Sequence, residues 1–205
     1  MSTYKLYYFN ARGQAEVSRL IFATAGQKYD DIRYQYNEWP LYASEMPLGE
    51  VPVLEYNGTK LPESRAIARF LAKQFRLAGR DNFEQAKVDA VVDTIKDLTT
   101  NYIQARWEDD EIKREEVTRK FLHEQLPEHL RNLEVLVKEY SNGGLFFIGN
   151  QLTWADLLFY NTGENILELD RNCLNNYPWL KQNRAEVARQ PRIAEYLRRR
   201  PITSF

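Results

Sequence analysis

The sequence predicts a small α/β unit followed by a larger all-helical unit. Short apolar strands alternate with amphipathic helices over roughly the first 75 residues. Within this region Asn57-Gly58, the strongest short hairpin signal, separates two strand-like runs. From Phe83 onward no strand pattern recurs and helical periodicity continues. We therefore expect one domain over residues 1–76, a linker over 77–82 and a helical domain over 83–205.

The first domain is expected to run β-α-β, then a loop, then β-β-α. Residues 4–9 are aromatic and apolar and predict a strand, and Gly26 closes the helical pattern that follows it. The remaining expected elements are strands over 29–36, 51–56 and 59–61 and a helix from Ser64.

The second domain is expected to contain helices over residues 83–107, 113–140, 154–169, 178–189 and 191–199. Pro127 lies inside the second of these and should kink it, because proline has no backbone N–H to donate. Thr153-Trp154-Ala155-Asp156 has the form of a capping box with aspartate at its last position, which predicts a helix start.

Composition excludes several functional classes. The net charge of -1 and pI near 6.2 give no electrostatic basis for binding nucleic acid or an anionic membrane. No apolar run approaches the roughly 18 residues needed to span a bilayer, and the first ten residues are too polar for a signal peptide. The single cysteine, Cys173, cannot form an internal disulfide, which favours a reducing, cytoplasmic location.

The stretch GEVPVLEYNGTKLPESRAIARFL, residues 49–71, predicts a peptide-binding surface. Pro52 cannot donate a ladder hydrogen bond, so the strand should end there and leave the backbone of Val51 open to an added strand. Glu63 and Ser64 lie at a helix N-terminus, where free N–H groups attract an anion and a carboxylate attracts a cation. Together these features suit a short peptide with a free amino-acid end.

These motifs resemble those of the cytosolic glutathione transferases, and most closely the sigma class. YYFNARGQAE resembles the first strand and catalytic turn of the family, GEVPVLEYNG its proline strand and hairpin, and ESRAIARFLA its glutathione-clamping helix. VDAVVDTIKDL, LTWADLLFY and the terminal RRP resemble helical segments of the class. The resemblance covers the whole chain and implies a thioredoxin-like domain, an all-helical domain and a homodimer.

The resemblance identifies Tyr8 as the catalytic residue, whose hydroxyl donates a hydrogen bond to the glutathione sulfur. A free thiol has a pKa near 8.5 and its thiolate is the nucleophile, so activation requires stabilisation of the anion. Glutathione is then a co-substrate, and no permanently bound cofactor is expected. Composition alone does not choose Tyr8, because the chain has 13 tyrosines and Tyr7 is adjacent.

The resemblance also implies two sets of binding residues. Trp39 reaches the glycyl end of glutathione, Val51 pairs with the cysteinyl backbone, and Asp97 reaches the γ-glutamyl ammonium bound to the partner subunit. The full implied glutathione set is Tyr8, Gln14, Trp39, Gly49, Glu50, Val51, Pro52, Glu63, Ser64 and Asp97. The implied set for a small hydrophobic electrophile is Phe9, Ala11, Gln104, Leu158, Thr162 and Phe205.

Several positions depart from the family pattern. Ala43 stands where a basic residue is usual, and Gln14 stands where the sigma class often has an arginine, so we expect weaker glutathione binding and thiolate activation. Glu63 replaces a common glutamine, and Lys96 interrupts an acidic cluster that would otherwise bind a divalent ion. Gln104 replaces a tryptophan expected in vertebrate prostaglandin D synthases, which argues against that isomerisation.

Three functions follow from these observations. The first is conjugation of glutathione to small hydrophobic electrophiles in detoxification, with peroxidase or prostaglandin isomerase side activities. The second is a structural role like that of the lens S-crystallins, with little activity. The third is non-catalytic carriage of hydrophobic ligands. We expect no metal site, because His123 and His129 lie six residues apart on different helical faces and no HExxH motif occurs.

Overall fold

The computed structural model describes residues 2–203 and divides into two compact units. The first comprises the chain up to Ala78 together with the chain from Arg189 onward, and the second comprises Gly79–Ala188. The last helix, which the sequence places in the expected helical domain over residues 83–205, contacts α1 of the first unit. It does so because its apolar side chain Ile193 is fully buried there.

A four-stranded mixed sheet forms the centre of the first unit. Its order is β2 (Asp30–Tyr34), β1 (Tyr4–Phe9), β3 (Val53–Tyr56) and β4 (Thr59–Pro62). β1 pairs in parallel with β2 and antiparallel with β3, and β3 and β4 form the hairpin predicted from Asn57-Gly58. β3 begins at Val53 rather than at residue 51, because Pro52 has no N–H for the ladder.

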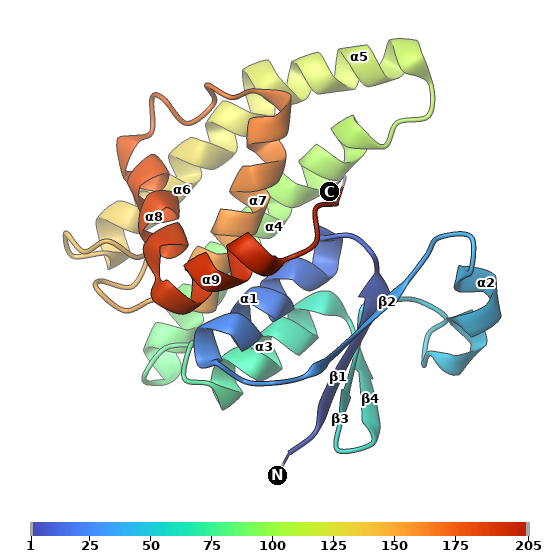
Figure 1. The fold of residues 1–205 in the computed structure, drawn as a ribbon. Helices are drawn as coiled ribbons and strands as arrows, with labels where there is room; N and C mark the ends of the chain where they lie inside the picture. The colour runs from blue at the N-terminus through green and yellow to red at the C-terminus, as the bar shows by residue number, and fades with distance from the viewer. Residues whose placement is uncertain (1, 204–205) are drawn as a thin grey trace. The chain divides into compact units, whose positions relative to one another are not determined.

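Helices flank this sheet. The unit contains α1 (Glu16–Ala25) after a 3-10 turn (Gly13–Ala15), α2 (Trp39–Tyr42) before a 3-10 turn (Ala43–Glu45), α3 (Ser64–Gln74) and α9 (Pro191–Arg199). In Figure 1, α1 and α3 lie side by side on one side of the strands and α2 lies on the other. α1 ends at Gly26, whose φ of 67° is the left-handed conformation that glycine adopts without strain.

The second unit is helical. It contains α4 (Asn82–Arg106), α5 (Glu111–Lys120), α6 (Leu126–Tyr140), α7 (Trp154–Leu169) and α8, which runs Pro178–Arg189. α4 packs against α5, α6 and α7. The predicted fold class, an α/β unit joined to a helical unit, is confirmed.

The helix expected over residues 113–140 changes its hydrogen-bond pattern close to Pro127. A π-helical segment, Phe121–Gln125, separates α5 from α6, and the backbone N–H of Leu126 donates to the carbonyl of Phe121. Pro127 then occupies the first turn of α6, directly after the π-helical segment, which accommodates a residue without an N–H to donate.

Candidate functional site

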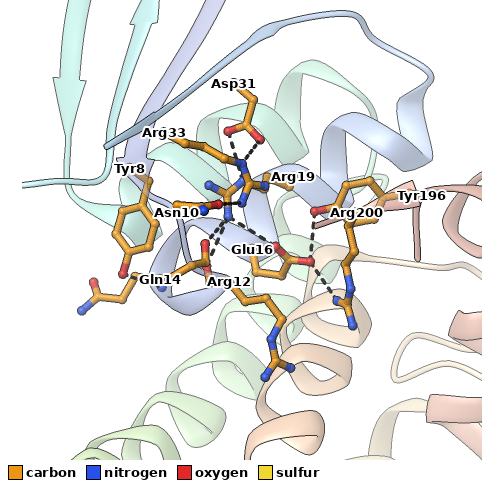
Figure 2. A network of polar contacts seen from close by, with 11 residues as sticks. Tyr8, Asn10, Arg12, Gln14, Glu16, Arg19, Asp31, Arg33, Tyr196 and Arg200 are labelled. Carbon is orange, nitrogen blue, oxygen red and sulfur yellow. Dashed lines mark hydrogen bonds and ion pairs between the residues drawn. The ribbon is translucent and has the colours of Figure 1, made fainter. Parts of the chain in front are cut away.

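The hydroxyl of Tyr8 lies near the carboxyl end of β1, beside the turn that leads into α1. Tyr8 is buried and shares its face of the strand with Leu6. The backbone N–H of Gln14 donates a hydrogen bond to Tyr8 Oη over 3.1 Å (Figure 2). Because this bond uses an oxygen lone pair, it leaves the phenolic proton available to an acceptor.

Tyr7 points to the opposite face of β1 and has a different partner. Its hydroxyl donates to Glu55 Oε2 on the neighbouring strand over 2.9 Å, and burial together with this carboxylate raises the pKa of Tyr7 to about 12. Lys5 also pairs with Glu55, at 3.1 Å. The hydroxyl proton of Tyr7 is therefore donated to Glu55 within the sheet. The hydroxyl of Tyr8, by contrast, accepts a hydrogen bond and keeps its proton for another acceptor.

The electrostatic surroundings of Tyr8 keep its phenol neutral. Burial raises its pKa above the usual 10.0, and this outweighs the opposing effects of the Gln14 N–H and the Arg19 guanidinium. A group that stays protonated at neutral pH can donate a hydrogen bond to an anion. The Gln14 N–H also brings a positive partial charge directly to the oxygen of Tyr8.

Gly13 permits the close approach of the turn to Tyr8. Its φ is 40°, and a Cβ built on Gly13 would lie 2.4 Å from Tyr8 Oη. Any other residue would therefore displace the hydroxyl or the turn. Sequence reasoning did not single out Gly13, although a glycine directly between charged and polar residues in NARGQ was the available signal.

Val51 offers the unpaired backbone that the sequence predicts. The Val51–Pro52 peptide bond is cis, and Gly49 just before it has a φ of 68°. Neither the N–H nor the C=O of Val51 bonds to another residue among those described. Glu50 is exposed beside it. An extended peptide can pair with Val51 in the manner of an added strand.

Glu63 and Ser64 lie at the N-terminus of α3. Ser64 is the first residue of the helix, and Glu63 precedes it with a φ of 76°, a conformation uncommon for a residue with a side chain. Glu63 is exposed and Ser64 half-buried. A carboxylate, a hydroxyl and the unpaired N–H groups of a helix start thus occur together, which suits the two opposite charges of an amino acid.

Aromatic residues gather on the same side of the sheet as α2. Trp39, the first residue of α2, is half-buried, with its ring 5.5 Å from that of Phe9 and 5.6 Å from that of Tyr34. Phe9 also stacks on Tyr36 at 4.4 Å. Ala43 begins the turn after α2 and brings no charge to this region.

The structure separates the predicted electrophile residues into different environments. Ala11 is 2% exposed, and its carbonyl is engaged by Arg19. In the second unit Gln104 is exposed on α4, as is Asp97, while Leu158 on α7 is half-buried. Thr162 is 2% exposed, with its Oγ1 3.4 Å from that of Thr99, so within its own unit it is a packing residue. Phe205 lies outside the described residues.

The sequence did not predict a network of polar side chains next to Tyr8. Glu16 and Arg19 of α1 are both buried, and they join the turn before α1 to Asp31 on β2 and to the C-terminal segment (Figure 2). The available signal was the presence of two charged residues, three apart, on a helix whose neighbours are apolar.

Two other kinds of feature are absent from residues 2–203, a metal-binding cluster and a membrane-spanning helix. Among residues 2–203, no group of three or more His, Cys, Asp or Glu side chains is arranged to hold a metal ion. No helix in the same range is both long enough and apolar enough to cross a bilayer.

Comparison with known families identifies the chain. The model for the Glutathione S-transferase N-terminal domain matches residues 4–73, and the model for the C-terminal domain of the same family matches residues 96–200. The chain belongs to the glutathione S-transferase family. The sheet with α1, α2 and α3 is accordingly the thioredoxin-like part of the family fold, and Tyr8, Val51, Glu63 and Ser64 all lie within its matched range.

Full-length relatives place the chain near the sigma class of this family. It is 37% identical over 205 residues to the hematopoietic prostaglandin D synthase of Homo sapiens and 35% identical over 206 residues to S-crystallin SL11 of Nototodarus sloanii, covering 100% of both chains in each case. The structure of rat hPGDS complexed with a quinoline matches with a TM-score of 0.91 at 38% identity, over 99% of this chain and 100% of that one. A structure of the Fasciola hepatica sigma class GST matches with the same TM-score at 28% identity, over 100% and 99% of the two chains.

Proposed function

We propose that this protein is a glutathione transferase in which Tyr8 stabilises the glutathione thiolate. The sulfur attacks a small hydrophobic electrophile, forming a carbon–sulfur bond as the leaving group departs. The observation that carries the proposal is the buried Tyr8 hydroxyl, which accepts from the Gln14 N–H and keeps its own proton for donation. Glutathione is a co-substrate in this proposal, and no resident cofactor is required.

The energy that this chemistry needs is within the range of one directed donor with help from the backbone. Lowering the thiol pKa from about 8.5 by about two units requires roughly 2.7 kcal/mol of preferential stabilisation of the anion. A hydrogen bond to a charged group contributes about 1.5–3 kcal/mol. The phenol of Tyr8 and the N–H groups of the adjacent turn supply donors of this strength.

The geometry of the first unit supports a binding mode for glutathione. The cysteinyl backbone of glutathione pairs with Val51, whose approach is shaped by Gly49, Glu50 and the cis Pro52. The γ-glutamyl group binds at Glu63 and Ser64, and the glycyl end lies near Trp39. The absence of a cation at position 43 predicts weak retention of the protein on immobilised glutathione.

Three further proposals complete this function. The protein acts as a cytoplasmic homodimer, in which Asp97 approaches the ligand of the partner subunit. Phe9, Leu158 and Gln104 contact the electrophile. Prostaglandin isomerisation is a candidate side activity because several relatives carry the name of that synthase, although Gln104 argues against it.

The alternative is a structural protein with little activity, favoured by the 35% identity to an S-crystallin. Conjugation of glutathione to chlorodinitrobenzene separates the two functions. A negligible rate for the wild-type protein supports the crystallin-like role.

The same assay tests Tyr8, with Tyr7→Phe as the matched control on the same strand. We expect Tyr8→Phe to lower the rate at neutral pH by about tenfold to a hundredfold, the loss of one charge-assisted hydrogen bond. Tyr7→Phe loses only its bond to Glu55 and should keep the wild-type rate. The wild-type rate should rise with pH as the thiol of glutathione ionises and then level off. Because the pKa of Tyr8 is raised above 10.0, its phenol stays protonated, and the rate should not decline at any pH up to 10. Equal rates for wild type and Tyr8→Phe would exclude this mechanism.

A further inference from the structure

One buried guanidinium, that of Arg19, makes hydrogen bonds to the turn that carries the Gln14 N–H. Arg19 is fully buried, and its Nη1 donates to the carbonyl of Ala11 over 2.6 Å and to that of Arg12 over 3.5 Å. These carbonyls immediately precede Gly13 and Gln14, the residues in contact with Tyr8. Arg19, which lies in α1, thus fixes the position of the Gln14 N–H through its hydrogen bonds to the two carbonyls.

Two carboxylates orient this guanidinium. Arg19 Nε pairs with Asp31 Oδ1 at 3.2 Å, and Nη1 lies 3.4 Å from Glu16 Oε2. Burial alone lowers the pKa of Arg19, but the carboxylates of Asp31 and Glu16 more than offset this, and the net shift is upward. Arg19 is therefore charged, and its planar fork makes directed bonds on two sides at once. Its carbon Cζ lies 5.8 Å from the centre of the Tyr8 ring.

The network continues into the C-terminal segment. Glu16 Oε1 accepts from the hydroxyl of Tyr196 over 3.0 Å and from Nη1 of Arg200 over 2.9 Å, while Oε2 faces Arg19 (Figure 2). Glu16 is 1% exposed, so in the folded protein these donors take the place of water. Tyr196 belongs to α9, which packs on α1 within the same unit.

A second chain of hydrogen bonds links Asp31 to Asn10, the residue that follows β1. Asp31 Oδ2 accepts from Arg33 Nε over 2.8 Å, and Arg33 Nη1 donates to Asn10 Oδ1 over 3.3 Å. The backbone N–H of Asn10 in turn donates to the carbonyl of Tyr34 over 2.9 Å. The turn is therefore tied to β2 at its beginning and to α1 in its middle.

We propose that Arg19 is a positioning residue for thiolate stabilisation, and that α9, through Tyr196 and Glu16, sets its orientation. Arg19 acts by holding the Ala11 and Arg12 carbonyls, which places the Gln14 N–H and hence the Tyr8 hydroxyl. The C-terminal helix, more than 170 residues from Tyr8 in sequence, is by this route a determinant of sulfur reactivity. This inference rests on the proposed role of Tyr8.

Two substitutions that leave the formal charge of the protein unchanged test the proposal. Arg19→Lys keeps the cation but loses the fork, and Tyr196→Phe keeps the ring but loses the hydroxyl that donates to Glu16. Tyr177→Phe is the matched control, because it also removes one hydrogen bond from a partly buried tyrosine hydroxyl. In this case the acceptor is the carbonyl of Pro127 in the second unit. The measured quantities are the pKa of the bound glutathione thiol, from the ultraviolet absorbance of the thiolate, and the glutathione Kd.

We expect both variants to raise the thiol pKa by at least about 0.5 units, with roughly a threefold lower conjugation rate below that pKa. The glutathione Kd should stay within about twofold of wild type, since Val51, Glu63 and Ser64 are untouched. Tyr177→Phe should change neither quantity. A merely structural role would lower the melting temperature and leave the thiol pKa in place.

The outcomes separate this inference from the proposed function. If Tyr8→Phe raises the thiol pKa and Tyr196→Phe does not, the α9 connection is wrong. If Arg19→Lys also leaves it unchanged, Arg19 acts through charge alone and is not a positioning residue. If Tyr8→Phe itself has no effect on the thiol pKa, the proposed function fails first. Tyr196→Phe keeps the test decisive if Arg19→Lys does not fold.

Discussion

At the scale of single residues, Gly13 sets how closely the turn approaches the Tyr8 hydroxyl. Its positive φ and the 2.4 Å distance from a built Cβ to Tyr8 Oη leave no room for a side chain. A methyl group there must displace either the hydroxyl or the Gln14 N–H that bonds to it.

Gly13→Ala should therefore impair catalysis more than stability. We expect the conjugation rate to fall by about tenfold or more, the scale of losing an aligned donor to an anion. The free energy of unfolding should drop by about 1 kcal/mol, because alanine resists a positive φ. Gly58→Ala is the control, since Gly58 also has a positive φ but no atom lies within 4 Å of its built Cβ. A Gly13→Ala protein with the wild-type rate would show that the close approach is not needed.

Glu16 and Arg19 form a buried ion pair, whose desolvation is offset by the hydrogen bonds around it. An isolated buried ion is strongly unfavourable, and removing one member of a pair leaves the other uncompensated. Here Glu16 has three donors around it and Arg19 has two carboxylates and two carbonyls. The pair is thus embedded in a network whose directed bonds fix the turn.

At the scale of secondary-structure elements, an aspartate secures the start of both α4 and α7, as the N-cap Asp81 of α4 and as Asp156, which forms a capping box with the N-cap Thr153 of α7. Asp81 is exposed and accepts from the N–H groups of Phe83 and Glu84. Asp156 is fully buried and accepts from Phe147, Thr153 and Asn183. The buried cap therefore also joins α7 to the preceding loop and to α8.

We expect Asp156→Ala to destabilise the protein by about 3 kcal/mol or more, because several buried donors lose their acceptor at once. Asp81→Ala should cost about 1 kcal/mol, the usual value of an exposed N-cap. Urea denaturation followed by circular dichroism measures both. Equal costs for the two substitutions would contradict the role assigned to burial.

At the scale of the whole molecule, the two ends of the chain meet in one unit. α9 packs on α1, where Ile193 is fully buried and Arg192 Nη1 donates to the Thr24 carbonyl over 3.2 Å. The first unit is therefore built from segments that lie far apart in the sequence.

Ile193→Ala should weaken the first unit. Loss of a buried isoleucine side chain costs about 2–5 kcal/mol. Because a chain with two units need not unfold in a single step, hydrogen exchange of the β1 and β3 amides is the suitable measurement. Ile202→Ala is the control, since Ile202 is fully exposed and its loss should leave exchange unchanged. Protection of β1 and β3 that survives Ile193→Ala would mean that α9 is not needed for their stability.

Much of the fold could be predicted because its determinants are local. Alternation specifies β1, Asn57-Gly58 the hairpin, Gly26 the end of α1, and Pro127 the change of hydrogen-bond pattern before α6. Boundaries were less accurate where a proline removed a donor, as at Val53, the start of β3. The motifs around Tyr8, Val51 and Glu63 likewise lie within short stretches, so the resemblance that they carry could be recognised without a structure.

The sequence by itself determined the four strands, the longer helices, the caps at Gly26 and at Thr153 with Asp156, and the family, since each depends on side chains a few residues apart. The resemblance chose Tyr8 over Tyr7, but only the tertiary structure supplies a physical difference between them, because Tyr7 donates to Glu55 whereas Tyr8 accepts from the Gln14 N–H. Tertiary structure alone also brought Tyr196 to Glu16 and assigned the last helix to the first unit. Such contacts join residues that are far apart in sequence, and local pattern carries no information about which distant partner will satisfy a buried polar group.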